Sequence, residues 1–264
     1  MSSTLTALAC GVLNCADPAS KVALTYAAAA AWRAGGLEIG TAQPPIRPAR
    51  PAKPDLMAAS HMPKRSTGPK GRVALVHALA HIELNAIDLA WDILARFANR
   101  DLPRAFFDDW VDVAHEEAEH YEALAQRLNE FGVSYGDLPA HDSLWESSEL
   151  TADDLLARLA LIPMTLEARG LDTTPLTCAK LCGNNDEPTA LILDRIFTDE
   201  IKHLAIGVRW FEFDCARRNL APHAHFEAVL KERFTGTLRP PFNMEARNQA
   251  GMAQGYLNFA LKIA

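Results

Sequence analysis

Four glutamates and two histidines are the residues of this chain whose types and spacing could bind metal ions. In chain order they are Glu83, Glu117, His120, Glu167, Glu200 and His203. Two of the glutamates are followed three residues later by a histidine. Residues three apart on a helix lie on one face, so the glutamate and histidine of each pair can reach the same ion. Because one Glu-x-x-His pair is common by chance, the prediction depends on the complete set.

The intervals between the glutamates repeat. Glu83 and Glu117 are 34 residues apart, Glu117 and Glu167 are 50 apart, and Glu167 and Glu200 are 33 apart. Each short interval matches one helix, a turn and the returning helix of an antiparallel hairpin. We therefore predict two similar hairpins joined by a longer crossover, each supplying a lone glutamate and then a Glu-x-x-His pair.

The six residues lie on apolar helix faces, which predicts that they point into a core. The apolar positions at helical spacing around them are Val76, Leu79, Ala80, Ile87 and Ala90 on the first helix, Trp110, Val113, Ala114, Tyr121, Leu124 and Leu128 on the second, Leu156, Leu159, Ala160 and Met164 on the third, and Leu193, Ile196, Phe197, Leu204, Gly207 and Phe211 on the fourth. Surface acids or a protonated network would be the alternative, and neither explains this agreement of spacing and face.

Four carboxylates that face one core require cations. Burying an ionised carboxylate costs several kcal/mol unless it is paired or bound to a metal. Protonating both histidines would leave two negative charges, whereas two divalent ions balance all four carboxylates. Mixed carboxylate and imidazole ligands suit iron or manganese better than a structural zinc ion. We therefore predict two iron ions, with manganese as the alternative; which carboxylates bridge them stays open.

Four long helices are needed to position these ligands. We predict them from Arg72 to Asn99, from the residue after Pro103 to Gly132, from a capping box at Thr151-x-x-Asp154 to Gly170, and from Pro188 to Asn219. Residues 133–150 form the crossover. Pro163 removes a backbone hydrogen bond one turn before Glu167, which predicts a kink there. The kink either opens the site to substrate or dioxygen or is a tolerated bend.

Further helices are predicted on both sides of this bundle. Residues 3–14 and 18–35 read as an N-terminal hairpin, and residues 223–235 and 245–263 as two C-terminal helices. We expect an all-α protein, a four-helix bundle with additional N- and C-terminal helices. Its predicted parts are an N-terminal helical hairpin, a Pro-rich strap or linker, the di-metal bundle and C-terminal helices packed on it, at residues 1–40, 41–71, 72–219 and 220–264.

A proline-rich basic segment separates the N-terminal hairpin from the bundle. Residues 41–70 contain seven prolines, interleaved with the basic residues Arg47, Arg50, Lys53, Lys64, Arg65 and Lys70. Such a composition favours extended chain over helix. The segment is interpreted as a strap over the core in preference to a linker. A basic arm for nucleic acid ranks last, because the segment lacks aromatic residues for base stacking.

Several other residues have two readings. His77 and His81 share a helix with Glu83, but His81 points about 160° away from it, so we expect both to bond to the N-terminal segment or strap. Tyr121 beside His120 is a redox or supporting group, or a core tyrosine, which we favour. Cys178 and Cys182 are interpreted as small core residues, since their spacing is not that of a zinc site.

Composition restricts the class of protein. The chain has 264 residues, of which 49% are hydrophobic, ample for a large core. Its net charge of −7 disfavours general binding to nucleic acid or anionic membranes. No apolar run approaches the roughly 20 residues of a membrane span, and the N-terminus lacks the basic region of a signal peptide. The five irregularly spaced cysteines predict no disulfide framework. We expect a cytoplasmic protein.

The ligand pattern resembles that of the ferritin-like di-iron carboxylate superfamily, in which two helices supply a glutamate each and two others a Glu-x-x-His each. The resemblance covers residues 72 to about 219 and all six ligand positions. More narrowly, the chain resembles domain-of-unknown-function family 455 in three runs: His77-Ala-Leu-Ala-His81-Ile-Glu83-Leu-Asn-Ala-Ile-Asp88, Leu166-Glu167-Ala-Arg169-Gly170-Leu-Asp172 and Pro241-Phe-Asn-Met-Glu-Ala-Arg247. This family implies a fold and a metal site but no substrate.

We expect an oxidoreductase or monooxygenase that activates dioxygen or peroxide on an unknown small-molecule or macromolecular substrate. The alternative is an iron-binding, ferroxidase or peroxide-scavenging protein without an organic substrate. A third reading, a structural protein with a metal staple, is disfavoured by the complete ligand set. A tRNA substrate stays open by analogy with di-iron tRNA monooxygenases, but a shared fold does not transfer a substrate. We expect a monomer or homodimer, because the extra helices would obstruct a storage shell.

Overall fold

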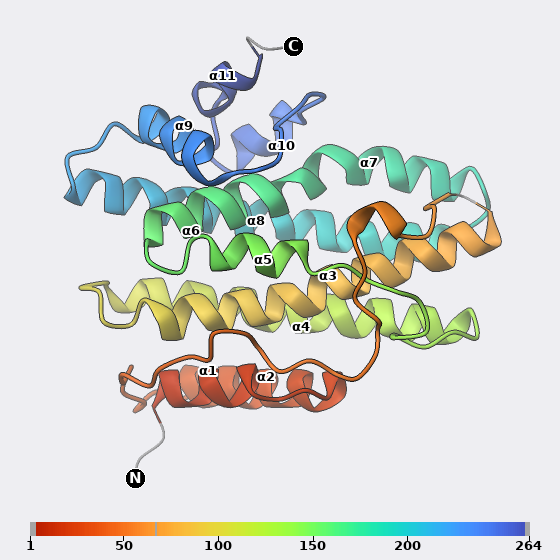
Figure 1. Ribbon diagram of the computed structural model, residues 1–264, viewed down its shortest axis with the longest axis horizontal. Coiled ribbons are helices and arrows are strands. Elements are labelled where there is room, and N and C mark those ends of the chain that lie inside the picture. The colour runs from red at the N-terminus through yellow and green to blue at the C-terminus, as the bar shows by residue number, and fades with distance from the viewer. Residues whose placement is uncertain (1–3, 67, 262–264) are drawn as a thin grey trace. The chain divides into compact units, whose positions relative to one another are not determined.

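The regular structure of this chain is helical. The computed structural model describes residues 4–66 and 68–261 (Figure 1). Its α-helices are α1 (Leu5–Leu13), α2 (Pro18–Arg33), α3 (Pro69–Arg96), α4 (Arg104–Glu130), α5 (Ser143–Glu149), α6 (Leu155–Leu161), α7 (Ala168–Cys182), α8 (Glu187–Arg217), α9 (Pro222–Arg233), α10 (Met244–Gln249) and α11 (Asn258–Leu261). Two short 3-10 helices, η1 (Ala59–His61) and η3 (Gln254–Leu257), and a π-helix, η2 (Ile162–Glu167), complete them. The predicted all-α class is confirmed.

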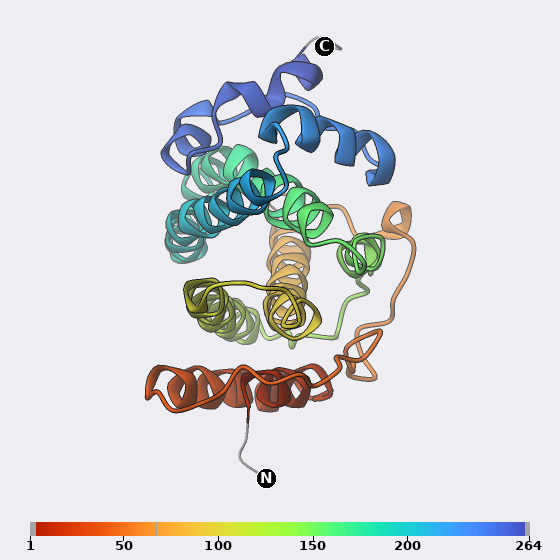
Figure 2. The same cartoon turned by 90° about the vertical axis from the view of Figure 1, so that its left-hand side faces the viewer.

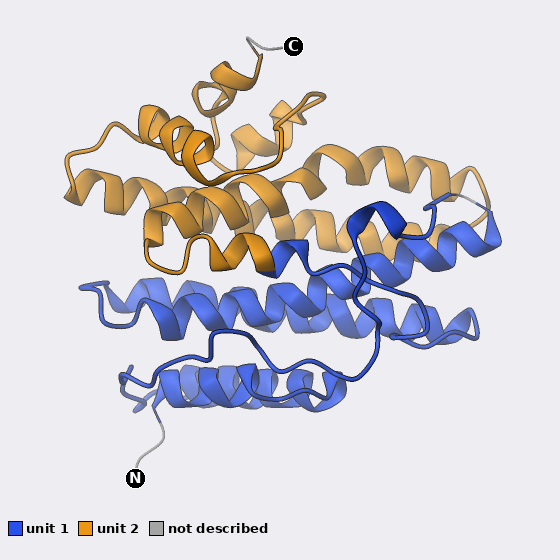
Figure 3. Ribbon diagram, viewed as in Figure 1, with its two compact units in different colours: residues 1–145 blue, residues 146–264 orange. Residues whose placement is uncertain are grey.

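The chain divides into two compact units, residues 1–145 and 146–264 (Figure 3). The first contains α1 to α4 and the second contains α6 to α11, with the boundary inside α5. The boundary falls within the predicted crossover, residues 133–150. Each unit therefore contains one of the two predicted hairpins, α3 with α4 and α7 with α8.

The first unit is built on the antiparallel pair α3 and α4, with α1 packed on α3 and α2 on α4 (Figures 1 and 2). The sequence explains where α2 begins and ends. The Asp17 side chain accepts a hydrogen bond from the Ser20 amide at 2.8 Å, and Pro18 occupies the first helical position. Past its end, Gly35 has a φ of +82°, which glycine adopts without steric cost. The predicted N-terminal hairpin is present within the described residues.

The proline-rich segment is extended and packs against the first unit. The Ala49 amide donates to the Leu13 carbonyl at 2.8 Å, and the Arg96 guanidinium donates to the Pro45 carbonyl at 2.9 Å. Arg50 reaches into the unit and pairs with the buried Asp88 at 2.8 Å. Backbone and side chains of residues 45–50 thus both bond to the helices beneath.

One helix is long and apolar enough to cross a membrane by length and composition. This helix is α3, and 72% of its most apolar window is buried inside the protein. The sequence expectation concerned an unbroken apolar run, and α3 has none of that length, because charged and polar residues interrupt it. Its burial is typical of the core helix of a soluble protein, and it carries the buried acids Glu83, Asp88 and Asp92.

The second unit is built on α7 and α8, with α6 and α9 packed together and α10 against α8 (Figure 1). Two predicted helix limits in it were wrong. The third helix begins with Asp154 as its cap, since that side chain accepts from the Leu156 amide and Thr151 instead bonds to the Ser148 carbonyl. It also continues past Gly170 to Cys182, because Gly170 does not adopt the positive φ that would end a helix.

The last predicted helix, residues 245–263, is broken. It stops at Gln249, and Gly251 follows with a φ of +80°. The Met252 amide then donates to the Arg247 carbonyl at 2.8 Å, the closing bond of a Schellman motif. The chain resumes as η3 and α11, so three short helical segments replace one long helix within the described residues.

Candidate metal centre

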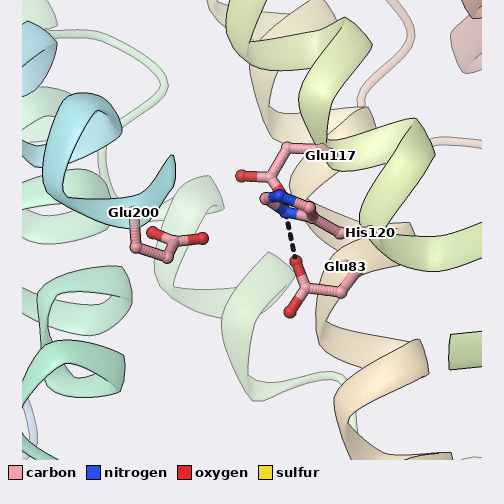
Figure 4. Close-up of side chains that lie close together, drawn as sticks. All are labelled: Glu83, Glu117, His120 and Glu200. Atoms are coloured by element: carbon pink, nitrogen blue, oxygen red, sulfur yellow. Dashed lines mark hydrogen bonds and ion pairs between the residues drawn. The ribbon is translucent and has the colours of Figure 1, made fainter. Parts of the chain in front are cut away.

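The first unit brings three of the predicted ligands together. Helix α3 supplies Glu83, and α4 supplies Glu117 and His120 (Figure 4). Their exposed fractions are 4%, 1% and 1%. The His120 Nδ1 lies 3.3 Å from a Glu117 carboxylate oxygen and 3.5 Å from a Glu83 oxygen. Ligand atoms of these three residues lie within 4.8 Å of one another, so they could hold a metal ion.

The electrostatics of this cluster suit a cation. Burial raises the pKa of Glu83 well above its usual value, and the nearby Glu117 carboxylate raises it further. The His120 ring lowers it again, but less. No lysine or arginine pairs with Glu83 in the described part of the chain. Two buried carboxylates that share one imidazole are thus a donor set for a divalent ion, which would replace the proton that burial favours on Glu83.

The second Glu-x-x-His pair, in the second unit, has a similar conformation. On α8 the His203 Nδ1 lies 3.6 Å from a Glu200 carboxylate oxygen, and His203 is buried. Figure 4 also labels Glu200, which belongs to this unit. Glu167 is half-buried at the last position of η2. The described residues contain no group of three or more close ligand atoms that includes Glu167 or His203.

A π-helix ends at Glu167. The Ala168 amide donates to the Pro163 carbonyl, five residues earlier, and the Thr165 hydroxyl donates to the Ala160 carbonyl at 2.7 Å. Pro163 has no amide of its own to donate, which explains why the regular α-helical bonding fails here. The sequence predicted a kink at Pro163; the irregularity is there, in the form of a π-helix. Such segments often occur at functional sites, and Glu167 is the last residue of this one.

Gly207 on α8 allows this π-helix to approach closely. A Cβ at Gly207 would lie 2.9 Å from two Pro163 ring carbons, which cannot rotate away. Gly207 is one turn beyond His203, so the contact fixes the spacing between the π-helix and the ligand face of α8.

We therefore expect Gly207→Ala to destabilise the protein by about 1–3 kcal/mol, the usual cost of overpacking. The matched control is Gly170→Ala on α7, where an added Cβ meets nothing within 4 Å. That change should stabilise the protein by about 0.4–1 kcal/mol, because alanine is the better helix former. Urea unfolding of both variants would check the pair, and equal stabilities would contradict the close packing at Gly207.

His77 and His81 bond to the crossover, not to the N-terminal segment or strap as expected. The Gly136 amide donates to His77 Nε2 at 2.9 Å. His81 Nδ1 lies 2.8 Å from the Tyr135 hydroxyl, and its Nε2 lies 3.2 Å from the His141 carbonyl. A carbonyl can only accept, so Nε2 carries the proton and Nδ1 accepts from the tyrosine. The crossover fold, which the sequence did not show, determines these partners.

This burial makes stability depend on pH. Burial first, and then the charge of Arg50, lower the pKa of His81 from 6.5 to about 4. Between these values the unfolded chain binds the proton more strongly than the folded protein does. The contribution of His81 to the free energy of unfolding is therefore fully present above pH 6.5 and falls as the pH drops toward 4, by about 3 kcal/mol at most. We expect His81→Gln to show a flatter dependence on pH over this range. Unfolding curves at pH 4.5 and 7 would test it, and parallel curves would exclude the effect.

Tyr121 is a core residue on α4. It is buried, and its ring packs edge-on against Tyr135 with centroids 5.5 Å apart. Burial raises its pKa. These surroundings support the interpretation of Tyr121 as a core tyrosine.

The interpretation of Cys178 and Cys182 as small core residues was wrong. All five cysteines are free; Cys178 is half-buried and Cys182 is exposed on α7, so they are not core residues. Among the described residues, neither cysteine belongs to a group of side chains close enough together to hold a metal ion.

Two buried charge clusters contact the ligand-bearing helices, and only some of their residues lie in the motifs recognised from the sequence. In the first unit, Asp88 on α3 pairs with Lys21 and Arg50. In the second, Asp172 on α7 accepts two hydrogen bonds from Arg247, at 2.9 and 2.7 Å. Asp88, Asp172 and Arg247 all belong to the runs that resemble family 455. Pairing partners so distant in sequence leave no local signal, apart from a charged residue in an apolar run.

Arg247 also contacts the backbone beside Glu167. Its guanidinium donates to the Ala168 carbonyl at 3.1 Å, one residue after Glu167, and its side chain is fully buried. The Asn243 amide donates to Asp172 at 2.9 Å. The C-terminal segment is thereby bonded to the junction of η2 and α7.

Comparisons with known proteins agree with this narrower resemblance. The family described as "Protein of unknown function (DUF455)" matches residues 14–258. An "Uncharacterized protein" of Haemophilus influenzae (strain ATCC 51907 / DSM 11121 / KW20 / Rd) is 39% identical over 219 residues, 81% of this chain and 76% of that protein. No solved structure matches the chain significantly. The match over nearly the whole chain, together with the placement of its motif residues in buried clusters, shows that the protein belongs to this DUF455 family.

Proposed function

We propose that the protein is a ferritin-like di-metal oxidoreductase that binds two iron ions, or manganese, and activates dioxygen or peroxide on a substrate. The ligands are Glu83, Glu117, His120, Glu167, Glu200 and His203. The observation that carries the proposal is the buried cluster of two glutamates and a histidine on α3 and α4. Its support is the similar Glu-x-x-His conformation on α8.

The charges of these residues determine what they do. A cation would displace the proton from Glu83, whose pKa is raised by burial, so affinity rises with pH. The Nδ1 atoms of His120 and His203 face the glutamates of their own motifs and would be unprotonated as ligands. Bound iron or manganese would supply redox electrons and open coordination positions, since six side chains do not fill the shells of two ions. The surrounding apolar residues exclude water and strengthen each of these interactions.

The test is anaerobic loading with ferrous iron followed by dioxygen. We expect two equivalents of iron to be oxidised, with an absorbance typical of a coupled ferric pair and no growing mineral. Continued uptake of iron into a mineral would favour the storage alternative, and no protein-specific oxidation would refute the proposal. Glu122→Gln, an exposed change on α4, is the control and should react like wild type.

A further inference from the structure

A second candidate binding site lies in the C-terminal part of the second unit, and it uses none of the proposed metal ligands. A pocket of about 570 Å³ opens between the end of α9, the loop that follows it and α11. Its lining residues are Leu230, Lys231, Phe234, Gly236, Thr237, Leu238, Arg239, Pro240, Phe259 and Ala260. Small-molecule sites usually fall between about 300 and 1,000 Å³ and have mostly apolar walls.

The polar groups of this pocket carry one sign of charge. Among the described residues, its lining contains two cations and no carboxylate. Lys231 is paired with Glu227 at 2.6 Å. The Arg239 guanidinium, in contrast, makes no ion pair or side-chain hydrogen bond within residues 4–66 and 68–261, and it is exposed at the pocket. Arg239 is therefore available to a ligand, and an arginine presents a planar fork that suits a carboxylate or a similar oxyanion.

The wall that carries Arg239 is held in place. Arg169 on α7 donates to the carbonyls of Arg239 and Pro241, at 2.9 and 3.1 Å. Arg169 is in turn paired with the buried Asp172 at 3.0 Å. The loop backbone is thus fixed to a helix while its arginine side chain stays free. A site that is formed before the ligand arrives loses less entropy on binding.

We propose that this pocket binds an amphipathic anion: an apolar acyl or aryl body that packs against Phe234, Leu238 and Phe259, with one anionic head on Arg239. The apolar lining of the pocket suits the body of such a ligand, and the Arg239 guanidinium suits its head. The apolar walls supply most of the affinity, and Arg239 selects for an anionic head over a neutral one. This site is independent of the proposed metal centre.

A matched pair of fluorescent probes tests the proposal on the full-length protein. The probes are 1-anilinonaphthalene-8-sulfonate, which has an anionic head, and N-phenyl-1-naphthylamine, its uncharged analogue. Both should bind wild type with one saturable equivalent. In Arg239→Gln the anionic probe should bind about tenfold more weakly, the loss of about 1.4 kcal/mol. The neutral probe should bind as before, which also shows that the pocket is still folded.

Two further variants make the result specific. Lys180→Gln removes an exposed cation from α7, away from the pocket lining, and should change neither probe. Leu238→Glu places a carboxylate in the pocket and should weaken both probes, the anionic one more. Decanoate should displace the anionic probe from wild type. The proposal is overturned if neither probe binds saturably, if Arg239→Gln leaves the anionic probe unchanged, or if Lys180→Gln weakens it equally.

Discussion

Arg247→Met is expected to destabilise the protein by about 3–5 kcal/mol, the usual cost of breaking a buried ion pair by removing one partner. The variant leaves the Asp172 carboxylate buried without the two hydrogen bonds that Arg247 donates. It also frees the Ala168 carbonyl beside Glu167. Methionine fills a similar volume, so the loss reports charge and hydrogen bonding more than packing. Urea unfolding at neutral pH measures it.

The matched control for this variant is Arg169→Met. Arg169 pairs with the same carboxylate, but its side chain is 41% exposed. Its removal should therefore cost only about 0–1 kcal/mol. If both variants lost the same stability, the buried pair would not be what holds the C-terminal segment to α7.

Glu117→Gln should have opposite consequences with and without metal. Without metal, we expect the variant to be at least as stable as wild type at pH 7.5. Burial and the charge of Glu117 raise the pKa of Glu83. Ionising Glu83 in the folded protein therefore lowers the free energy of unfolding, and this loss is absent below the ordinary pKa of a glutamate and grows as the pH rises. Glutamine removes one of the two like charges.

With metal, the order should reverse. Ligand binding stabilises wild type by about 4 kcal/mol when free metal is 1,000 times its Kd, and the variant should gain far less. Thermal unfolding with and without ferrous iron under nitrogen measures both effects. Equal stabilisation of the two proteins by metal would show that Glu117 does not bind it.

Residues close in sequence made much of this architecture predictable. The intervals between glutamates anticipated the hairpins α3 with α4 and α7 with α8, and the apolar stripes anticipated that Glu83, Glu117, His120 and His203 are buried. These features repeat every three or four residues, so a single sequence displays them. The end of α4 was equally local, because Gly132 adopts a φ of +73° just past Glu130.

The errors came from longer-range determinants. Whether a glycine ends a helix depends on its φ, which is why Gly170 lies within α7 whereas Gly251 ends α10. The close packing of Pro163 against Gly207, 44 residues later, also has no local signal in the sequence. Partners such as Asp172 and Arg247 are 75 residues apart, and tertiary folding alone brings them together.

The most direct test of the central claim is the number of metal ions that each chain binds. Anaerobic equilibrium dialysis against ferrous iron, followed by elemental analysis, would count them in wild type and in the Glu117→Ala and Glu200→Ala variants. We predict two tightly bound ions per wild-type chain and loss of the second equivalent in each variant. Two tightly bound ions retained in both variants, or no tightly bound ion in wild type, would contradict the di-metal assignment.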